Sequence, residues 1–123
     1  GEDNPDGLQV EPEVQPGECH ISWTPRPCYQ GYADVLHGGI AALLLDEAMA
    51  YAARSLVGNC ATAEMSTRFM RPISTHAPLR VDGRVVDRRR RLLTTEAELT
   101  QDGNVCARAT ARFVLVRQPV PGE

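Results

Sequence analysis

The run of residues 40–57 constrains the fold of this chain more than any other segment. It has no proline and no strand-like alternation, and it is rich in Ala, Leu and Met, which favour helix. The Gly-Asn pair at 58–59 is typical of a helix C-terminus. The first fourteen residues of the run are apolar apart from Asp46 and Glu47. Because a helix without a polar face must be buried, we expect the rest of the chain to enclose it.

Alternating apolar and polar residues predict five strands around this helix. One strand precedes the helix, with Cys19, Ile21 and Trp23 on one face. Four follow it, within residues 60–72, 79–86, 91–101 and 104–116. The Asp-Gly pair at 102–103 favours a tight hairpin between the last two. The order of one strand, a buried helix and four strands indicates an α+β fold in which an antiparallel sheet curls around a single helix.

The length of 123 residues is that of one domain. Residues 1–16 hold three prolines and several acids, a composition that predicts a loose N-terminal arm. We expect a single folded domain over residues 17–118 and a short C-terminal tail over residues 119–123.

Composition argues against two classes of protein. The net charge of −3 has the wrong sign for a nucleic-acid-binding domain, which is normally basic. No apolar run approaches the roughly 20 residues that span a bilayer, so we expect no membrane segment. The first residues also lack the cationic and apolar stretches of a secretory signal, which predicts a cytoplasmic protein.

Two further features favour structural rather than functional interpretations. The four cysteines lie too far apart in the sequence for a zinc or redox motif, which favours buried or idle thiols. The run Arg88–Arg91 is the one basic cluster. A solvated hairpin bend is the favoured interpretation of this run, and a contact with phosphate is the alternative.

Asp46 and Glu47 are unusual because their helical neighbours are apolar. An ionised carboxylate without a partner is costly in such surroundings. Either acid could face solvent or a subunit interface, or could pair with an Arg from a strand. The Gly38-Gly39 pair favours a catalytic role instead, because free N–H groups at a helix start can stabilise an oxyanion. His37 could cap the helix or contact a substrate.

Helix geometry adds a constraint to a catalytic role. Asp46 lies eight residues after Gly38, which separates the two by roughly 12 Å at about 1.5 Å per residue. One carbonyl group cannot contact both. Two copies related by a two-fold axis, with antiparallel helices, would bring the glycine end of one helix to the aspartate of the other. A catalytic role therefore predicts an obligate dimer with two composite sites.

Two segments resemble one known family. The stretches YQGYADVLHGGIAALLLDEAMA and CATAEMSTRFMRP, at residues 29–50 and 60–72, are similar to the hotdog-fold acyl-CoA thioesterases. These form the superfamily of 4-hydroxybenzoyl-CoA thioesterase and the phenylacetate-pathway-like proteins. The likeness covers roughly residues 19–117. It implies an antiparallel sheet of five or six strands around the long helix, and dimers that join their sheets edge to edge.

The resemblance also implies roles for the matching residues. The N–H of Gly38 would polarise the thioester carbonyl, with His37 beside it. Asp46 would be the nucleophile or the general base. Thr62, sixteen residues later, would orient the attacking water or the acid. Both routes for Asp46 are open at this point.

Substrate-binding residues are implied less directly. Gln30, in the Tyr-Gln-Gly segment, is a candidate second donor to the carbonyl or else a loop residue. Glu47 would have a supporting role, because it points about 100° away from Asp46 on the helix. Arginines suit the phosphates of coenzyme A. The candidate substrate-binding residues are Gly39, Gln30, Gly31, Glu47, Arg68 and Arg71.

The implied function is hydrolysis of an acyl-CoA to the free acid and coenzyme A, by a homodimer or a pair of dimers, with no metal or redox cofactor. The alternative is a non-catalytic hotdog module that binds acyl-CoA as a sensor. A hotdog hydratase is a third hypothesis, but His20 and His76 do not match the His and acid pair that it needs. Asp46 and Thr62 together favour the thioesterase.

Overall fold

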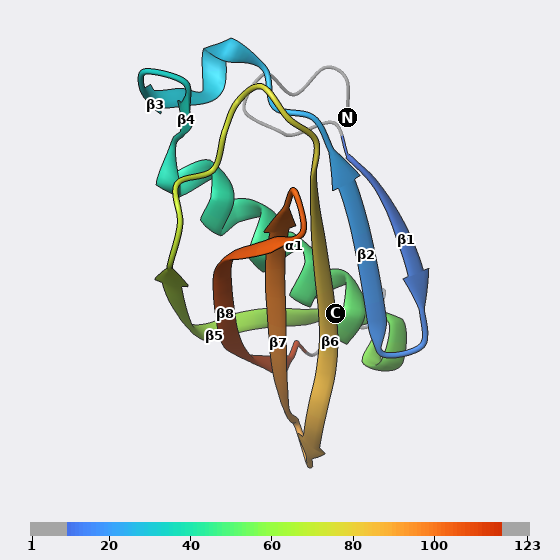
Figure 1. Cartoon of the computed structure of the whole chain (residues 1–123). Helices are drawn as coiled ribbons and strands as arrows, with labels where there is room; N and C mark the ends of the chain where they lie inside the picture. The colour runs from blue at the N-terminus through green and yellow to red at the C-terminus, as the bar shows by residue number, and fades with distance from the viewer. Residues whose placement is uncertain (1–9, 117–123) are drawn as a thin grey trace, which may run out of the picture.

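The computed structural model describes residues 10–116, in which one long helix lies against a curled antiparallel sheet (Figure 1). Helix α1 spans Gly38–Val57. The six-stranded sheet has the order β1-β2-β6-β7-β8-β5, and a separate pair, β3 and β4, precedes the helix. No helix in the described part of the chain is long and apolar enough to cross a membrane. The strands are β1 (Glu11–Gln15), β2 (Glu18–Trp23), β3 (Gln30–Tyr32), β4 (Val35–Leu36), β5 (Cys60–Phe69), β6 (Leu79–Arg89), β7 (Leu92–Gln101) and β8 (Asn104–Leu115).

The α+β architecture predicted from the sequence is confirmed. One long helix, with eight buried residues, packs against an antiparallel sheet, and the four strands after it fall where the alternating residues placed them. The helix begins at Gly38, two residues before the expected start, because His37 caps it. Asp102 and Gly103 form the predicted hairpin turn with φ values of 53° and 78°.

The loose arm predicted for residues 1–16 is wrong in its last part. Glu11–Gln15 form β1, which pairs with β2 along its whole length. Four of its five side chains are exposed, so ladder hydrogen bonds rather than apolar burial hold it. The sequence therefore carries no alternation that would reveal this strand. Residues 1–9 and the predicted tail at 119–123 lie outside the described residues.

The helix approaches the sheet most closely at Gly83 on β6. A Cβ atom at Gly83 would lie 2.7 Å from the backbone C and O atoms of Ala48, a separation that real Cβ atoms do not show. Gly83 pairs with Ala97 on β7, and Ala97 pairs with Ala109 on β8. This row of small residues seats the alanine-rich helix, in which Ala48 and Ala52 are fully buried.

Larger apolar side chains fill the space on both sides of this row. The helix contributes Leu44, Leu45 and Met49, all fully buried. The strands enclose them with side chains that alternate toward the helix, as the sequence predicted. The largest fully buried strand side chains are Ile21, Val81, Leu93, Leu99 and Phe113.

Three of the four cysteines are buried, as the sequence favoured, and all four are free thiols. Burial, with smaller contributions from the carboxylates of Glu47 and Asp82, raises the pKa of the Cys19 thiol to about 11. The reactive thiolate is therefore scarce at Cys19 near neutral pH. The buried cysteines are Cys19, Cys60 and Cys106, and the exposed one is Cys28.

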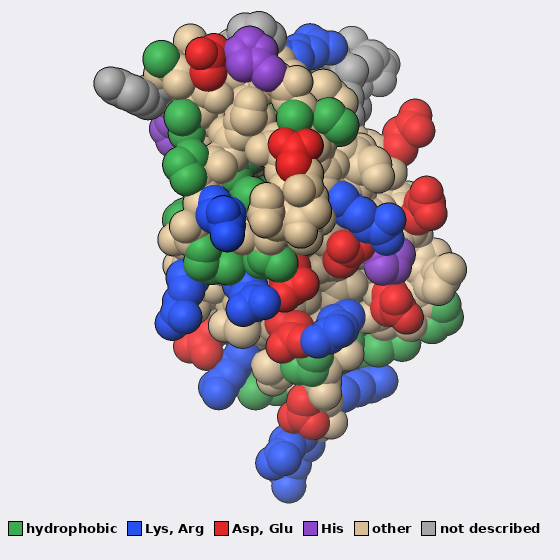
Figure 2. Space-filling view, in the orientation of Figure 1, with side chains coloured by type: hydrophobic (Ala, Val, Ile, Leu, Met, Phe, Trp, Pro, Cys, Tyr) green, Lys and Arg blue, Asp and Glu red, His purple; other side chains and the backbone are tan. Residues whose placement is uncertain are grey.

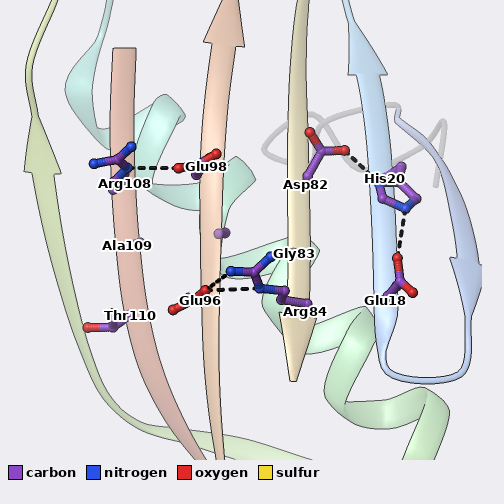
Figure 3. Close-up of a pocket in the computed structure, with 11 residues that line it drawn as sticks. Glu18, His20, Asp82, Gly83, Arg84, Glu96, Glu98, Arg108, Ala109 and Thr110 are labelled. Atoms are coloured by element: carbon purple, nitrogen blue, oxygen red, sulfur yellow. Dashed lines mark hydrogen bonds and ion pairs between the residues drawn. The ribbon is translucent and has the colours of Figure 1, made fainter. Parts of the chain in front are cut away.

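The outer face of the sheet, away from the helix, is charged and internally paired. Figure 2 shows basic and acidic side chains interspersed over it. Arg84 pairs with Glu96 beside a hollow of about 400 Å³ (Figure 3). Arg108 Nε donates to Glu98 at 2.8 Å on the neighbouring strands. Each of these two pairs joins opposite charges on neighbouring strands, so its members neutralise one another within the face.

The run Arg88–Arg91 lies at the tip of the β6–β7 hairpin, which projects beyond the rest of the sheet (Figure 1). Arg90 adopts a φ of 57° in the turn, and all four side chains are exposed. Arg91 also donates to the carbonyl of Leu115 at 3.0 Å. The interpretation of this run as a solvated hairpin bend is confirmed, and the phosphate contact stays a prediction.

Substitution Gly83→Ala tests the close contact between helix and sheet. The added Cβ would overlap the Ala48 carbonyl group, so we expect the free energy of unfolding to fall by about 1–3 kcal/mol. Urea denaturation measures this loss. The double variant with Ala48→Gly should not recover it, because the atoms at 2.7 Å belong to the backbone. Unchanged stability of Gly83→Ala would contradict the packing described.

Candidate active site

Asp46 lies where α1 passes the edge strand β5. Thr62 Oγ1 donates a hydrogen bond of 3.0 Å to Asp46 Oδ1. Asp46 is half-buried, whereas Thr62 is exposed because β5 is the last strand of the sheet. The structure therefore brings together the two residues that the sequence predicted, and it leaves them accessible at the sheet edge.

The adjacent acid, Glu47, points away from β5, toward the part of the sheet that contains β2. Successive residues on a helix differ by about 100° in direction. The carboxylate of Glu47 helps to raise the pKa of Cys19 on β2, and three strands separate β2 from β5. Only Asp46 of the two acids reaches the β5 edge.

His37 immediately precedes the first residue of α1 and contacts the start of the helix. Its backbone has φ −58° and ψ 131°, and its Nδ1 accepts a hydrogen bond of 2.8 Å from the N–H of Gly39. A Cβ atom at Gly39 would lie 3.0 Å from the His37 ring, so a glycine there lets the ring fold over the helix end. His37 is therefore an N-cap, which is one of the two roles that the sequence left open.

Gly38 is the first helical residue, and its N–H differs from that of Gly39. Within residues 10–116 the N–H of Gly38 has no hydrogen-bond acceptor, whereas the N–H of Gly39 is bonded to His37. Free N–H groups in the first helical turn carry a partial positive charge. Gly38 thus presents the donor predicted for an oxyanion, and the N–H of Gly39, predicted as a further substrate contact, is already used.

A groove of about 370 Å³ opens beside Gly38. Its walls come from β4 and from residues 69–73. The Phe69 ring lies against the helix start, with Cζ 3.8 Å from the position of a Cβ at Gly38. The lining is apolar apart from one charged side chain, that of Arg71. The groove can therefore hold an apolar group with an anionic part near Arg71.

The two candidate arginines lie on different faces. Arg71 lines the groove, and its N–H donates to the carbonyl of Cys106 at 3.1 Å. In the pairing of β5 with β8, Arg68 lies opposite Arg108, whose side chain is on the outer face of the sheet. Phe69 lies opposite Ala107, which is buried on the inner face. Directly opposed strand residues point to the same face. The structure therefore brings Arg71 to the groove and keeps Arg68 away from it.

Gln30 and Gly31 lie in β3, which pairs with β4 just before the helix. Gln30 is opposite Leu36, two residues before Gly38. Its Oε1 accepts a hydrogen bond of 3.2 Å from the N–H of Asp34, and its NH₂ group is the part that can donate to a substrate. Gln30 is thus near the helix start and is tied to its own hairpin.

Sequence reasoning missed the backbone contacts that hold the helix start. The N–H of His37 donates to the carbonyl of Tyr29, and the N–H of Leu36 donates to that of Ile73, each at 2.8 Å. Every residue offers a backbone carbonyl, so residue types give no signal for such contacts.

The donor and the acid remain two half-sites within one chain. Gly38 and Asp46 lie eight residues apart on one continuous helix, which separates them by roughly 12 Å. A single thioester carbonyl cannot contact both groups of the same copy.

Comparison with known proteins gives two matches in sequence. Residues 33–107 match the sequence profile described as the thioesterase superfamily. The chain is also 34% identical over 116 residues to the Saccharolobus solfataricus protein named "Putative esterase SSO1253", which covers 91% of this chain and 75% of that protein.

Solved structures share the fold. Zebrafish thioesterase superfamily member 2 has a TM-score of 0.84 at 21% identity, over 93% of this chain and 89% of that one. A hypothetical thioesterase of Streptococcus pneumoniae TIGR4, solved with coenzyme A, has a TM-score of 0.83 at 19% identity, over 91% and 92% of the two chains. Two more structures of the latter carry alanine in place of a threonine and of an aspartate. These likenesses confirm the predicted hotdog fold.

Substitution His37→Ala should weaken the helix start. It leaves the N–H of Gly39 without its acceptor, so we expect the free energy of unfolding to fall by about 1 kcal/mol. Chemical denaturation measures the loss. His37→Asn can accept at a similar position and should recover most of it. Equal destabilisation of the two variants would show that capping is not the role of this side chain.

Proposed function

This chain belongs to the thioesterase superfamily and is a thioester hydrolase, and we propose that it hydrolyses acyl-CoA at composite sites, each formed by two copies of the chain. The observation that carries the proposal is the hydrogen bond from Thr62 to Asp46 at the open edge of the sheet. It holds a carboxylate in a fixed orientation where a thioester can reach it. The products are the free acid and coenzyme A, and the reaction needs no metal or redox cofactor.

Three groups account for the chemistry. The N–H of Gly38 polarises the thioester carbonyl and stabilises the oxyanion that forms from it. Asp46 of the other copy attacks the carbonyl carbon or takes a proton from the attacking water. Thr62 orients the Asp46 carboxylate through its hydrogen bond of 3.0 Å.

We propose that two copies join through β5. It is an edge strand of ten residues, and most of its side chains are exposed. At its end, Phe69 and Met70 are 50% and 40% exposed. An open edge of this length is a ready site for pairing with another strand, and a two-fold axis would join the two sheets into one.

One register of that pairing also matches the charges. With Ser66 at the two-fold axis, Arg68 lies directly opposite the partner's Glu64, because equal steps on either side of the axis face each other. Within one chain Arg68 lies beside Arg108, a like charge. Pairing in this register therefore places an acidic residue next to Arg68, whereas β8 places a basic one there. The two-fold axis repeats this contact, so each dimer contains it twice.

The same register assembles the half-sites. Phe69, which adjoins Gly38, comes opposite the partner's Ala63, one residue from the threonine that is bonded to Asp46. The N–H donor of one copy and the carboxylate of the other then share one stretch of the interface.

The similar structures support both the substrate and the residues. The S. pneumoniae thioesterase was solved with coenzyme A. In its two alanine variants, the substituted aspartate and threonine lie sixteen residues apart, the spacing of Asp46 and Thr62. For the phosphates of coenzyme A we propose Arg71, the charged residue of the groove beside Gly38.

Thiol release from a panel of short acyl-CoA thioesters tests the activity. We expect Asp46→Asn to lower kcat/KM by about 10²–10⁴-fold, the usual effect of losing a catalytic acid or base. Thr62→Val should cost about tenfold, because one orienting hydrogen bond is lost, and Thr62→Ser should restore most of the rate. Equal thiol release by wild type and Asp46→Asn would remove the catalytic assignment, and tight binding without turnover by the wild type would favour a sensor.

Mixing two inactive variants tests whether the sites are composite. Gly38→Pro removes only the N–H donor, because proline is tolerated at the first helical position and the extended His37 backbone can precede it. We expect a loss of about 10²–10³-fold in kcat. Refolding an equal mixture with Asp46→Asn should restore about a quarter of the wild-type rate, because half of the dimers then hold one intact site. Sites contained in one copy would show no recovery.

Charge reversal tests the register. Arg68→Glu places like charges opposite each other at two positions per dimer, so we expect the dimer dissociation constant to rise by about tenfold or more. Sedimentation over a dilution series measures it. Adding Glu64→Arg should restore association. Arg88→Glu makes the same charge change on the β6–β7 hairpin and should have no effect. Equal behaviour of the two single variants would reject this register.

A further inference from the structure

Gln101, at the end of β7, is the most highly bonded buried side chain that the proposed chemistry does not use. It is 6% exposed. Its Oε1 accepts from the N–H of Ser74 at 2.8 Å, and its Nε2 donates to the carbonyls of Ser74 and Ala77 at 2.9 and 3.0 Å. One amide group thus clamps the backbone of the connection between β5 and β6 at two places.

That connection in turn holds the strand that leads into α1. Ser74 forms a β-bridge with Val35. On either side of the bridge, the Ile73 carbonyl accepts from the N–H of Leu36 at 2.8 Å, and the N–H of Thr75 donates to the backbone carbonyl of Asp34 at 3.0 Å. Figure 1 shows the connection, in yellow-green, running past β4 and the start of the helix. Three residues of this junction, Leu36, Ile73 and Thr75, are each at most 4% exposed.

We propose that Gln101 is a positioning residue for thioester hydrolysis. It fixes the connection at Ser74, the connection fixes β4 through the bridge at Val35, and β4 ends one residue before the cap of the helix that presents Gly38. This inference rests on the proposed function, in which the N–H of Gly38 is the oxyanion donor. Gln101 never touches the substrate and acts only through the direction of that N–H.

The proposal follows from how strongly oxyanion stabilisation depends on geometry. A donor must lie about 2.7–3.1 Å from the position that the oxyanion will occupy, and small misplacements reduce the rate steeply. Without the clamp, the partly buried carbonyls of Ser74 and Ala77 each lose a hydrogen-bond donor, and the connection is free to shift. Arg71, proposed for the phosphates of coenzyme A, is anchored separately by its backbone N–H on the carbonyl of Cys106, so kcat should fall while KM stays nearly constant.

The test compares Gln101→Met with Thr95→Val in hydrolysis of a short acyl-CoA. Thr95 is a matched control, because it is buried on the same strand and donates one hydrogen bond of 3.0 Å, to the carbonyl of Ala111, away from the connection. We expect Gln101→Met to lower kcat about tenfold with KM changed less than about twofold. Thr95→Val should lower thermal stability and keep kcat within about twofold of wild type. If Gln101→Met does not fold, Gln101→Asn keeps the amide oxygen and the NH₂ group on a shorter arm and should show the same pattern more weakly.

A double variant locates the step at which Gln101 acts. In the Gly38→Pro background the donor is already absent, so Gln101→Met should change kcat by less than about twofold. An unchanged tenfold loss in that background, or equal kcat losses for Gln101→Met and Thr95→Val, would overturn the role of Gln101 and leave the proposed function intact. A wild-type kcat for Gly38→Pro alone would overturn the proposed donor, and the role of Gln101 with it.

Discussion

The seating of α1 on the sheet is the constraint on which the rest of the structure depends. At Gly83 the helix backbone comes so close that not even one methyl group fits between the two layers. The row from Gly83 through Ala97 to Ala109 permits this contact across three strands. Because the helix cannot slide over such a close contact, the positions of its start and of its middle relative to the sheet edge are both fixed.

That fixed helix determines what the site can be. It carries the free N–H of Gly38 at one end and the carboxylate of Asp46 two turns later, and β5 follows the same side of the helix. A rigid helix keeps these groups apart within one copy, so the proposed chemistry requires a second copy. The open β5 edge and the like-charged neighbours Arg68 and Arg108 favour a partner at the same place.

Much of this could be predicted from the sequence, because the signals were periodic or chemically unusual. The apolar helix and the alternating strands predicted directly which residues are buried. Two acids within an apolar run indicated a functional site at Asp46. The spacing to Thr62 came with the family resemblance. In contrast, β1 was missed because its side chains are exposed and it is held by its backbone. The clamp by Gln101 was missed for a related reason, since its partners are carbonyl and N–H groups that every residue possesses.

The tight contact at Gly83 also decides where the tail of a substrate can travel. Ala48 and Ala52, which face this contact, are fully buried, so their small side chains leave no open space for a substrate between helix and sheet. In the proposed dimer, a tail that enters beside Asp46 has to extend sideways along the interface between the two copies. Its permitted length is then set by the shape of the neighbouring subunit, and chain-length preference becomes a property of the assembly.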